Sequence, residues 1–212
     1  MQDFIHRTRL ARSKKLDKVG RKLIKLGISS NLITSFSLIF GLLGVYFLFS
    51  KYYLFLVFIL LHIAFDAFDG VVARLEEKKL AKIGIVRSSF GKYFDHLFAD
   101  GLVTLLLVAK VGWYLSDIYA YMIAGLMLFM FMVYGFTRMR SPVLFTRTLT
   151  VVMLLIYVPA FYDSVLWLTL VYLTNGVAAA WALARQVQWF VSGKWEIRDQ
   201  IQVFLIFSKY PK

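Results

Sequence analysis

Apolar residues along this chain fall into long runs that short polar segments separate. Six runs approach the roughly 20 residues that a helix needs to cross a bilayer. They cover residues 31–49, 52–73, 90–113, 118–137, 148–162 and 164–184. The fifth run is short and contains Pro159, so we expect its helix to include flanking residues. The pattern predicts an all-α fold with six transmembrane helices.

The N-terminal segment has a different pattern, because its apolar residues recur at helical spacing among cations. Residues 2–26 contain nine Lys and Arg, and the apolar positions are Leu16, Val19, Leu23 and Leu26. This spacing predicts a basic amphipathic helix in the membrane interface, facing anionic headgroups and ended by Gly27. A nucleic-acid-binding arm is the alternative. It is disfavoured because the segment leads directly into an apolar run and has one aromatic residue, Phe4.

Composition supports a membrane protein of one domain. Hydrophobic residues make up 60% of the chain and charged residues 17%, against roughly 45–50% and 25% in soluble domains. We divide the chain into a juxtamembrane helix (1–28), the six-helix membrane domain (29–192) and a basic C-terminal tail (193–212). Cysteine is absent, which excludes disulfides and thiolate metal sites.

The distribution of the net charge of +13 along the chain indicates how the protein is oriented in the membrane. With six spans, all of the 25 Lys and Arg residues except Lys51 and Lys110 fall on one side of the membrane. The positive-inside rule therefore predicts a multi-pass protein with both termini and the segment after Arg74 in the cytosol.

The second apolar run contains two carboxylates, Asp66 and Asp69. An ionised side chain at bilayer depth costs roughly 2.5–3.5 kcal/mol, so a cation is expected to neutralise them. On a helix Asp66, Asp69, Gly70 and Ala73 share one face. Carboxylates are hard oxygen ligands for Mg²⁺ or Mn²⁺, and the two small residues leave room for a bulky ligand at the backbone. Arg74 adds a fixed cation at the end of this segment.

A second acidic segment follows in the third run, where Asp95 comes four residues after Gly91 and Asp100 lies further along. Together the two segments resemble the CDP-alcohol phosphotransferase family, whose pattern is DxxDGxxAR, a gap, then GxxxDxxxD. The first block matches in full from Asp66 to Arg74, and Gly91 with Asp95 matches the start of the second. The gap holds sixteen residues, longer than is usual in the family, and Ala99 occupies the place of the fourth aspartate.

The resemblance implies an integral membrane enzyme of phospholipid synthesis. It would transfer a phosphatidyl-type group from a CDP-linked lipid to a small alcohol and release CMP. By resemblance, one or two Mg²⁺ or Mn²⁺ ions are held by Asp66, Asp69, Asp95 and Asp100. The nucleotide is bound by the first two of these acids with Gly70, Ala73, Arg74 and Gly91. The fourth aspartate acts as the catalytic base. The resemblance also allows a homodimer and implies no nucleic-acid partner.

The displaced fourth aspartate, Asp100, needs a local change of helix geometry to reach the site. A residue five positions after Asp95 is rotated about 140° from it on a regular helix. A bulge with i to i+5 bonding absorbs one residue, so we predict a π-type widening that turns Asp100 into the site as base or ligand. The alternative is that His96, four residues before Asp100, changes the pairing. A helix-boundary histidine without a metal role is the simpler interpretation of His96.

Four arginines beyond the motif are expected at the cytosolic depth of the acids. Arg138, Arg140 and Arg185 are candidates for binding a phosphorylated acceptor, since guanidinium groups suit phosphate. Anchoring by the positive-inside rule explains them equally well, and it is the interpretation for Arg147. Asn31 and Thr34 resemble an NxxT sequence found at this point in the family, and helix capping explains them as well.

Two other functions remain open from the residues alone. A transporter also has intramembrane acids, although transporter sites usually lie near the bilayer midplane in broken helices. A family member with impaired catalysis is the other alternative, because the fourth acid is displaced. The acceptor alcohol cannot be derived from the sequence.

Overall fold

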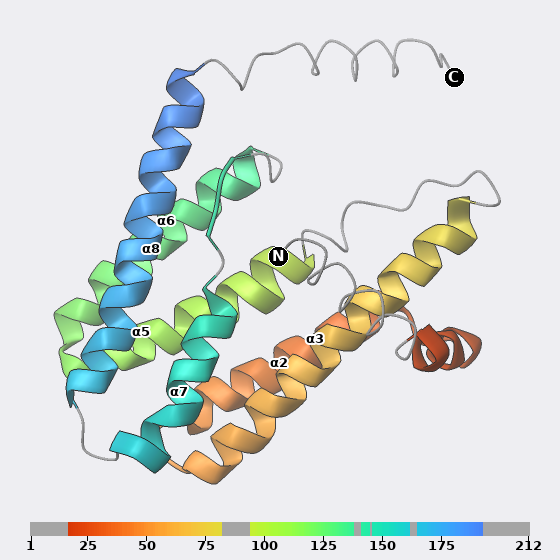
Figure 1. The fold of residues 1–212 in the computed structure, drawn as a ribbon, viewed down its shortest axis with the longest axis horizontal. Helices are drawn as coiled ribbons and strands as arrows, with labels where there is room; N and C mark the ends of the chain where they lie inside the picture. The colour runs from red at the N-terminus through yellow and green to blue at the C-terminus, as the bar shows by residue number, and fades with distance from the viewer. Residues whose placement is uncertain (1–16, 82–93, 138–140, 145, 162–164, 193–212) are drawn as a thin grey trace, which may run out of the picture.

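The structure is a computed structural model that describes residues 17–81, 94–137, 141–144, 146–161 and 165–192. Its elements are a helix over 17–25, α2 (Ser30–Phe47), α3 (Tyr52–Ala81), the π-helix η1 (Phe94–Leu102), α5 (Val103–Leu115), α6 (Asp117–Phe136), α7 (Arg147–Phe161) and α8 (Val165–Val191) (Figure 1). Over these ranges the chain forms helices and no strands, which confirms the all-α prediction for them.

The described residues of the six expected spans lie mostly in helices. Four of these helices are long and apolar enough to cross a membrane: α2, α3, α6 and α8. The third expected span is divided between η1 and α5. The fifth corresponds to α7, whose 15 residues cover about 22 Å, less than the roughly 30 Å of a hydrocarbon core. The four long apolar helices, α2, α3, α6 and α8, are consistent with a multi-pass membrane protein.

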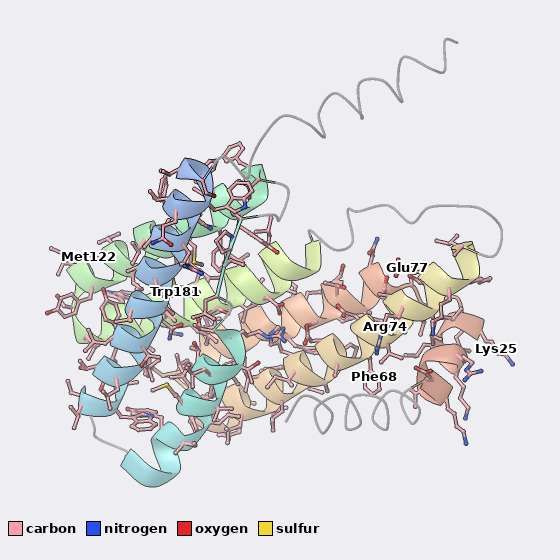
Figure 2. The ribbon with its side chains drawn as sticks, turned by 45° about the horizontal axis from the view of Figure 1, so that its top comes forward. Lys25, Phe68, Arg74, Glu77, Met122 and Trp181 are labelled. Carbon is pink, nitrogen blue, oxygen red and sulfur yellow. The ribbon has the colours of Figure 1, made fainter. Side chains whose placement is uncertain are left out.

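Small residues bring α2 and α3 into close contact, side by side in both views (Figures 1 and 2). A Cβ on Gly41 would lie 2.7 Å from Cγ2 of Val103 and 3.1 Å from Nδ1 of His62. A Cβ on Gly44 would lie 3.3 Å from Cδ1 of Ile59. Such small residues allow helix backbones to approach in a membrane protein.

The main apolar core joins the α2–α3 pair to the rest of the bundle, and α7 lies between that pair and α8 (Figure 1). Its buried members are Leu48, Phe55, Ile59, Val103, Leu107, Val111, Val151, Leu154, Tyr157, Leu168 and Val171. These residues come from α3, α5, α7 and α8, together with the turn after α2. This packing fixes the first turn of α7 relative to α3.

The segment 17–25 is helical, as its periodicity predicts, and it packs against the C-terminal part of α3. A Cβ on Gly20 would lie 2.9 Å from Cδ1 of Leu75, so the glycine allows this contact. Gly27 has φ 77° and its N–H donates to the carbonyl of Ile24 at 3.0 Å. The prediction that Gly27 ends this helix is confirmed, because a left-handed glycine after the last turn is a common helix end.

Candidate functional site

The two acids of the DxxDGxxAR segment lie on α3, well inside the helix. With a rise of about 1.5 Å per residue, Asp66 lies about 21 Å and Asp69 about 25 Å from Tyr52, where α3 begins. If α3 entered the hydrocarbon core at Tyr52, both acids would lie in the second half of a core of roughly 30 Å. The Asp66 side chain is 19% exposed and Asp69 is buried.

Arg147, the first residue of α7, supplies a cation to two acids, Asp66 and Asp100. Its Nη2 lies 2.5 Å from Oδ2 of Asp66, and its Nη1 forms an ion pair with Oδ1 of Asp100. One guanidinium therefore connects a carboxylate of α3 with a carboxylate of η1. The side chain of Arg147 is 14% exposed and that of Asp100 is 15% exposed. Sequence reasoning assigned Arg147 only to membrane anchoring and missed this role.

The π-helix η1 explains how Asp100 reaches Arg147. The predicted widening is confirmed, and it extends over nine residues, Phe94–Leu102, instead of a single turn. Bonding from i to i+5 rotates later residues backwards relative to a regular helix. Asp100 then turns its carboxylate towards Arg147, while Ala99 is fully buried. The Thr104 hydroxyl donates to the Asp100 carbonyl at 2.6 Å, which supports the change back to α-helix at Val103.

Hydroxyl groups of α2 contact three ionisable side chains of α3. The pairs are Ser30 with Glu76 (2.8 Å), Thr34 with Asp69 (2.6 Å) and Ser37 with His62 (2.9 Å). The donor to the buried Asp69 is the hydroxyl of Thr34, and a hydrogen bond to a charged group contributes about 1.5–3 kcal/mol. Thr34 therefore fixes the position of a predicted metal ligand. The sequence indicated Thr34 only through its NxxT spacing.

His62 is a buried polar residue that sequence reasoning did not single out. Its Nδ1 lies 2.9 Å from the carbonyl oxygen of Ser37, and because a carbonyl only accepts, Nδ1 carries the proton. Its Nε2 is buried with no hydrogen-bond partner within the described parts of the chain. His62 precedes Asp66 by one helical turn, so a polar residue at that spacing in an apolar run was the available signal.

The small and basic end of the motif lies on the exposed side of α3. Around Gly70 no atom would lie within 4 Å of an added Cβ, so this position borders open space among the described residues. Arg74 is exposed, and its Nε donates to the Gly70 carbonyl at 2.9 Å. Ala73, between them, is half-buried. Among the described residues, none fills the room that was expected beside Gly70.

Some of the predicted site residues or their side chains are not described by the structure. Gly91, Arg138 and Arg140 lie outside the described residues, and so do the side chains of Asp95 and His96, whose backbones belong to η1.

Arg185, on α8, points to partners on its own helix. Its Nη1 donates to Oε1 of Gln188 at 3.1 Å, and its guanidinium lies 5.7 Å from the ring centre of Trp181. Figure 2 shows Trp181 well apart from Arg74 on α3.

The start of α7 is held by a buried polar network with α8. Oδ1 of Asn175 accepts hydrogen bonds from the hydroxyls of Thr146 at 2.6 Å and Thr150 at 2.9 Å. The Asn175 amide donates to the Val171 carbonyl at 2.8 Å. These bonds surround the backbone of Arg147 and fix the point from which its side chain reaches the acids.

The carboxylates of Asp66 and Asp100 suit a divalent cation in donor chemistry and charge. They present hard oxygen atoms at one mostly buried position that a cation already occupies, the guanidinium of Arg147. Within the described residues no three His, Asp or Glu side chains form a group that could hold a metal ion. An ion bound here would take carboxylate oxygens from Arg147.

Protein-family models, curated proteins and solved structures provide no match to the chain.

Proposed function

We propose that this protein is an enzyme of the CDP-alcohol phosphotransferase type, with six transmembrane spans and its site on the cytosolic side. It would transfer a phosphatidyl-type group from a CDP-linked lipid to an alcohol and release CMP. One observation carries the proposal: Asp66 of the DxxDGxxAR segment and Asp100 of the second acidic segment reach the same cation. Both halves of the motif therefore contribute a carboxylate to one position.

The residues would divide the work by their chemistry. Asp66, Asp69, Asp95 and Asp100 would hold one or two Mg²⁺ or Mn²⁺ ions, which supply the charge that neutralises a pyrophosphate. The open space at Gly70, the small Ala73 and the exposed Arg74 would accommodate the nucleotide, with Gly91 approaching from the second segment.

Asp100 would act as the base of the transfer step. The acceptor hydroxyl oxygen attacks the lipid-linked phosphorus, a new P–O bond forms, and the P–O bond to CMP breaks. The hydroxyl proton passes to the Asp100 carboxylate, and CMP leaves with the electron pair of the broken bond. The position of Asp100 in a π-helix supports this role, because such widenings are frequent at functional sites.

The depth of the acids favours an enzyme over a transporter. A transporter site is expected near the midplane in broken helices, whereas Asp66 and Asp69 lie in an unbroken α3. If α3 enters a hydrocarbon core of roughly 30 Å at Tyr52, both acids lie beyond its midplane. The lipid chains of the donor would remain in the bilayer beside the helices. A homodimer, as the resemblance allows, is compatible with this arrangement.

The test is an assay of CMP release by the purified protein. Protein in detergent is incubated with CDP-diacylglycerol, Mg²⁺ and one alcohol at a time: glycerol phosphate, inositol phosphate, inositol or serine. The proposal predicts CMP and a new phospholipid with at least one acceptor. A folded protein that yields neither product with any acceptor would support the impaired or the transport function instead.

A further inference from the structure

The contact between Arg147 and the two aspartates has a consequence for how a metal ion enters the site. The guanidinium uses separate nitrogens for the two acids: Nη2 for Asp66 and Nη1 for Asp100. All three side chains are at least four-fifths buried, so water screens their charges weakly. The arginine therefore holds the two carboxylates together as a fixed internal counterion.

A divalent ion cannot coordinate Oδ2 of Asp66 and Oδ1 of Asp100 while the guanidinium is paired with the same two oxygens. Mg²⁺ requires carboxylate oxygens at about 2.0–2.1 Å, and Oδ2 of Asp66 already lies 2.5 Å from a guanidinium nitrogen. Two cations at this spacing also repel each other in a medium of low dielectric constant. Binding of the ion through these two oxygens therefore requires the guanidinium to leave.

We propose that Arg147 competes with divalent cations for Asp66 and Asp100, and that it preserves the acid pair until an ion replaces it. This inference rests on the proposed function only for the identity of the ion. The apparent metal affinity then equals the intrinsic affinity of the acids multiplied by the fraction of molecules in which the guanidinium has moved away. Arg147 acts here as a positioning residue that sets the metal affinity.

The local structure allows the side chain to move while its backbone stays in place. Hydrogen bonds from Thr146 and Thr150 to Asn175 anchor the start of α7 to α8. Arg147 itself is the first residue of α7, and its long side chain has several rotatable bonds. Release of the guanidinium therefore changes side-chain torsions and leaves the packing of α7 intact.

The test measures metal binding directly, without nucleotide or lipid substrate. Purified wild type, Arg147→Gln and Arg147→Lys are titrated with Mn²⁺, and free Mn²⁺ is followed by its electron paramagnetic resonance signal. We expect Arg147→Gln to bind at least about tenfold more tightly, because the amide is neutral and keeps a hydrogen-bond donor. Arg147→Lys should fall between it and the wild type, because one ammonium group does not span both acids as the fork of arginine does.

Lys79→Gln is the matched control, since it removes one exposed positive charge from the cytosolic extension of α3. Its Mn²⁺ affinity should equal that of the wild type within about twofold, because an exposed charge is screened by salt. If Arg147→Gln does not yield folded protein, the comparison of Arg147→Lys with Lys79→Gln decides the question. Equal or weaker Mn²⁺ binding by the Arg147 variants overturns the inference. This result is independent of CMP release, so failure of the transfer assay leaves it standing.

Discussion

Asp66 and Asp100 belong to different helices, and both of their carboxylates reach the guanidinium of Arg147. The convergence depends on two features. α3 places Asp66 on a regular helical face, and the π-helix η1 rotates Asp100 towards the same point. The two acidic segments of the sequence thus meet at one guanidinium, which α7 contributes.

The first prediction tests whether Asp100, as the π-helix orients it, is the catalytic base. Asp100→Ala should lose at least about a hundredfold in the rate of CMP release, because general acid–base groups contribute typically 10²–10⁴-fold. Adding Ala99→Asp on that background should restore little, since Ala99 is fully buried and its side chain points into the core. The assay compares both variants with the wild type at saturating Mg²⁺. Near wild-type activity of Asp100→Ala would exclude Asp100 as the base.

The second prediction concerns the support of Asp69 by Thr34. Thr34→Val removes the hydroxyl that donates to Asp69 at 2.6 Å and keeps the side-chain shape. We expect a 10- to 100-fold loss of metal affinity or activity, which is typical when a group that orients a metal ligand is removed. Thr34→Ser keeps the hydroxyl and should lose less than about threefold. Similar losses in both variants would mean that the methyl group matters and the hydrogen bond does not.

The third prediction compares two helical glycines. An added Cβ at Gly41 would lie 2.7 Å from Val103, whereas at Gly125 it would meet nothing within 4 Å. Gly41→Ala should therefore destabilise the protein by about 1–3 kcal/mol through overpacking. Gly125→Ala should leave stability unchanged or raise it by up to about 1 kcal/mol, because alanine favours helix. Thermal unfolding in detergent checks both variants, and equal midpoints would contradict the tight α2–α3–α5 contact.

The fourth prediction concerns the acceptor. Arg138, Arg140 and Arg185 were selected because guanidinium groups suit a phosphorylated alcohol. Arg185 contacts Gln188 and Trp181 on its own helix, so binding an acceptor would require its side chain to turn. We expect faster CMP release with glycerol phosphate or inositol phosphate than with inositol or serine. A preference for inositol or serine would show that these arginines serve only as membrane anchors.

Features that depend on neighbouring residues were predicted well from the sequence. Apolar runs located the helices, Gly27 ended the segment 17–25, and the extra residue between Asp95 and Asp100 indicated a widened helix. In each case the cause lies within one or two turns of the chain, where spacing determines which residues share a face.

Contacts between distant helices were the part that the sequence did not reveal. A cation near the acids was expected, but Arg147 was not identified as that cation, because its position depends on how α7 packs between α3 and α8. The same holds for Thr34, whose hydroxyl reaches Asp69 only because α2 lies against α3. For Asp95, the role as a metal ligand stays a prediction, since its side chain lies outside the described residues.

The most direct measurement of the central claim is Mg²⁺-dependent CMP release by the wild type and by single acid-to-amide variants. Asp66→Asn, Asp69→Asn and Asp95→Asn should each abolish release from CDP-diacylglycerol, and a chelator should abolish it in the wild type, because charge stabilisation by the ion is lost. Asp117→Asn, at the start of α6, is the matched control and should keep its activity. Substantial CMP release by any of the three site variants, or release that a chelator does not affect, would contradict the account.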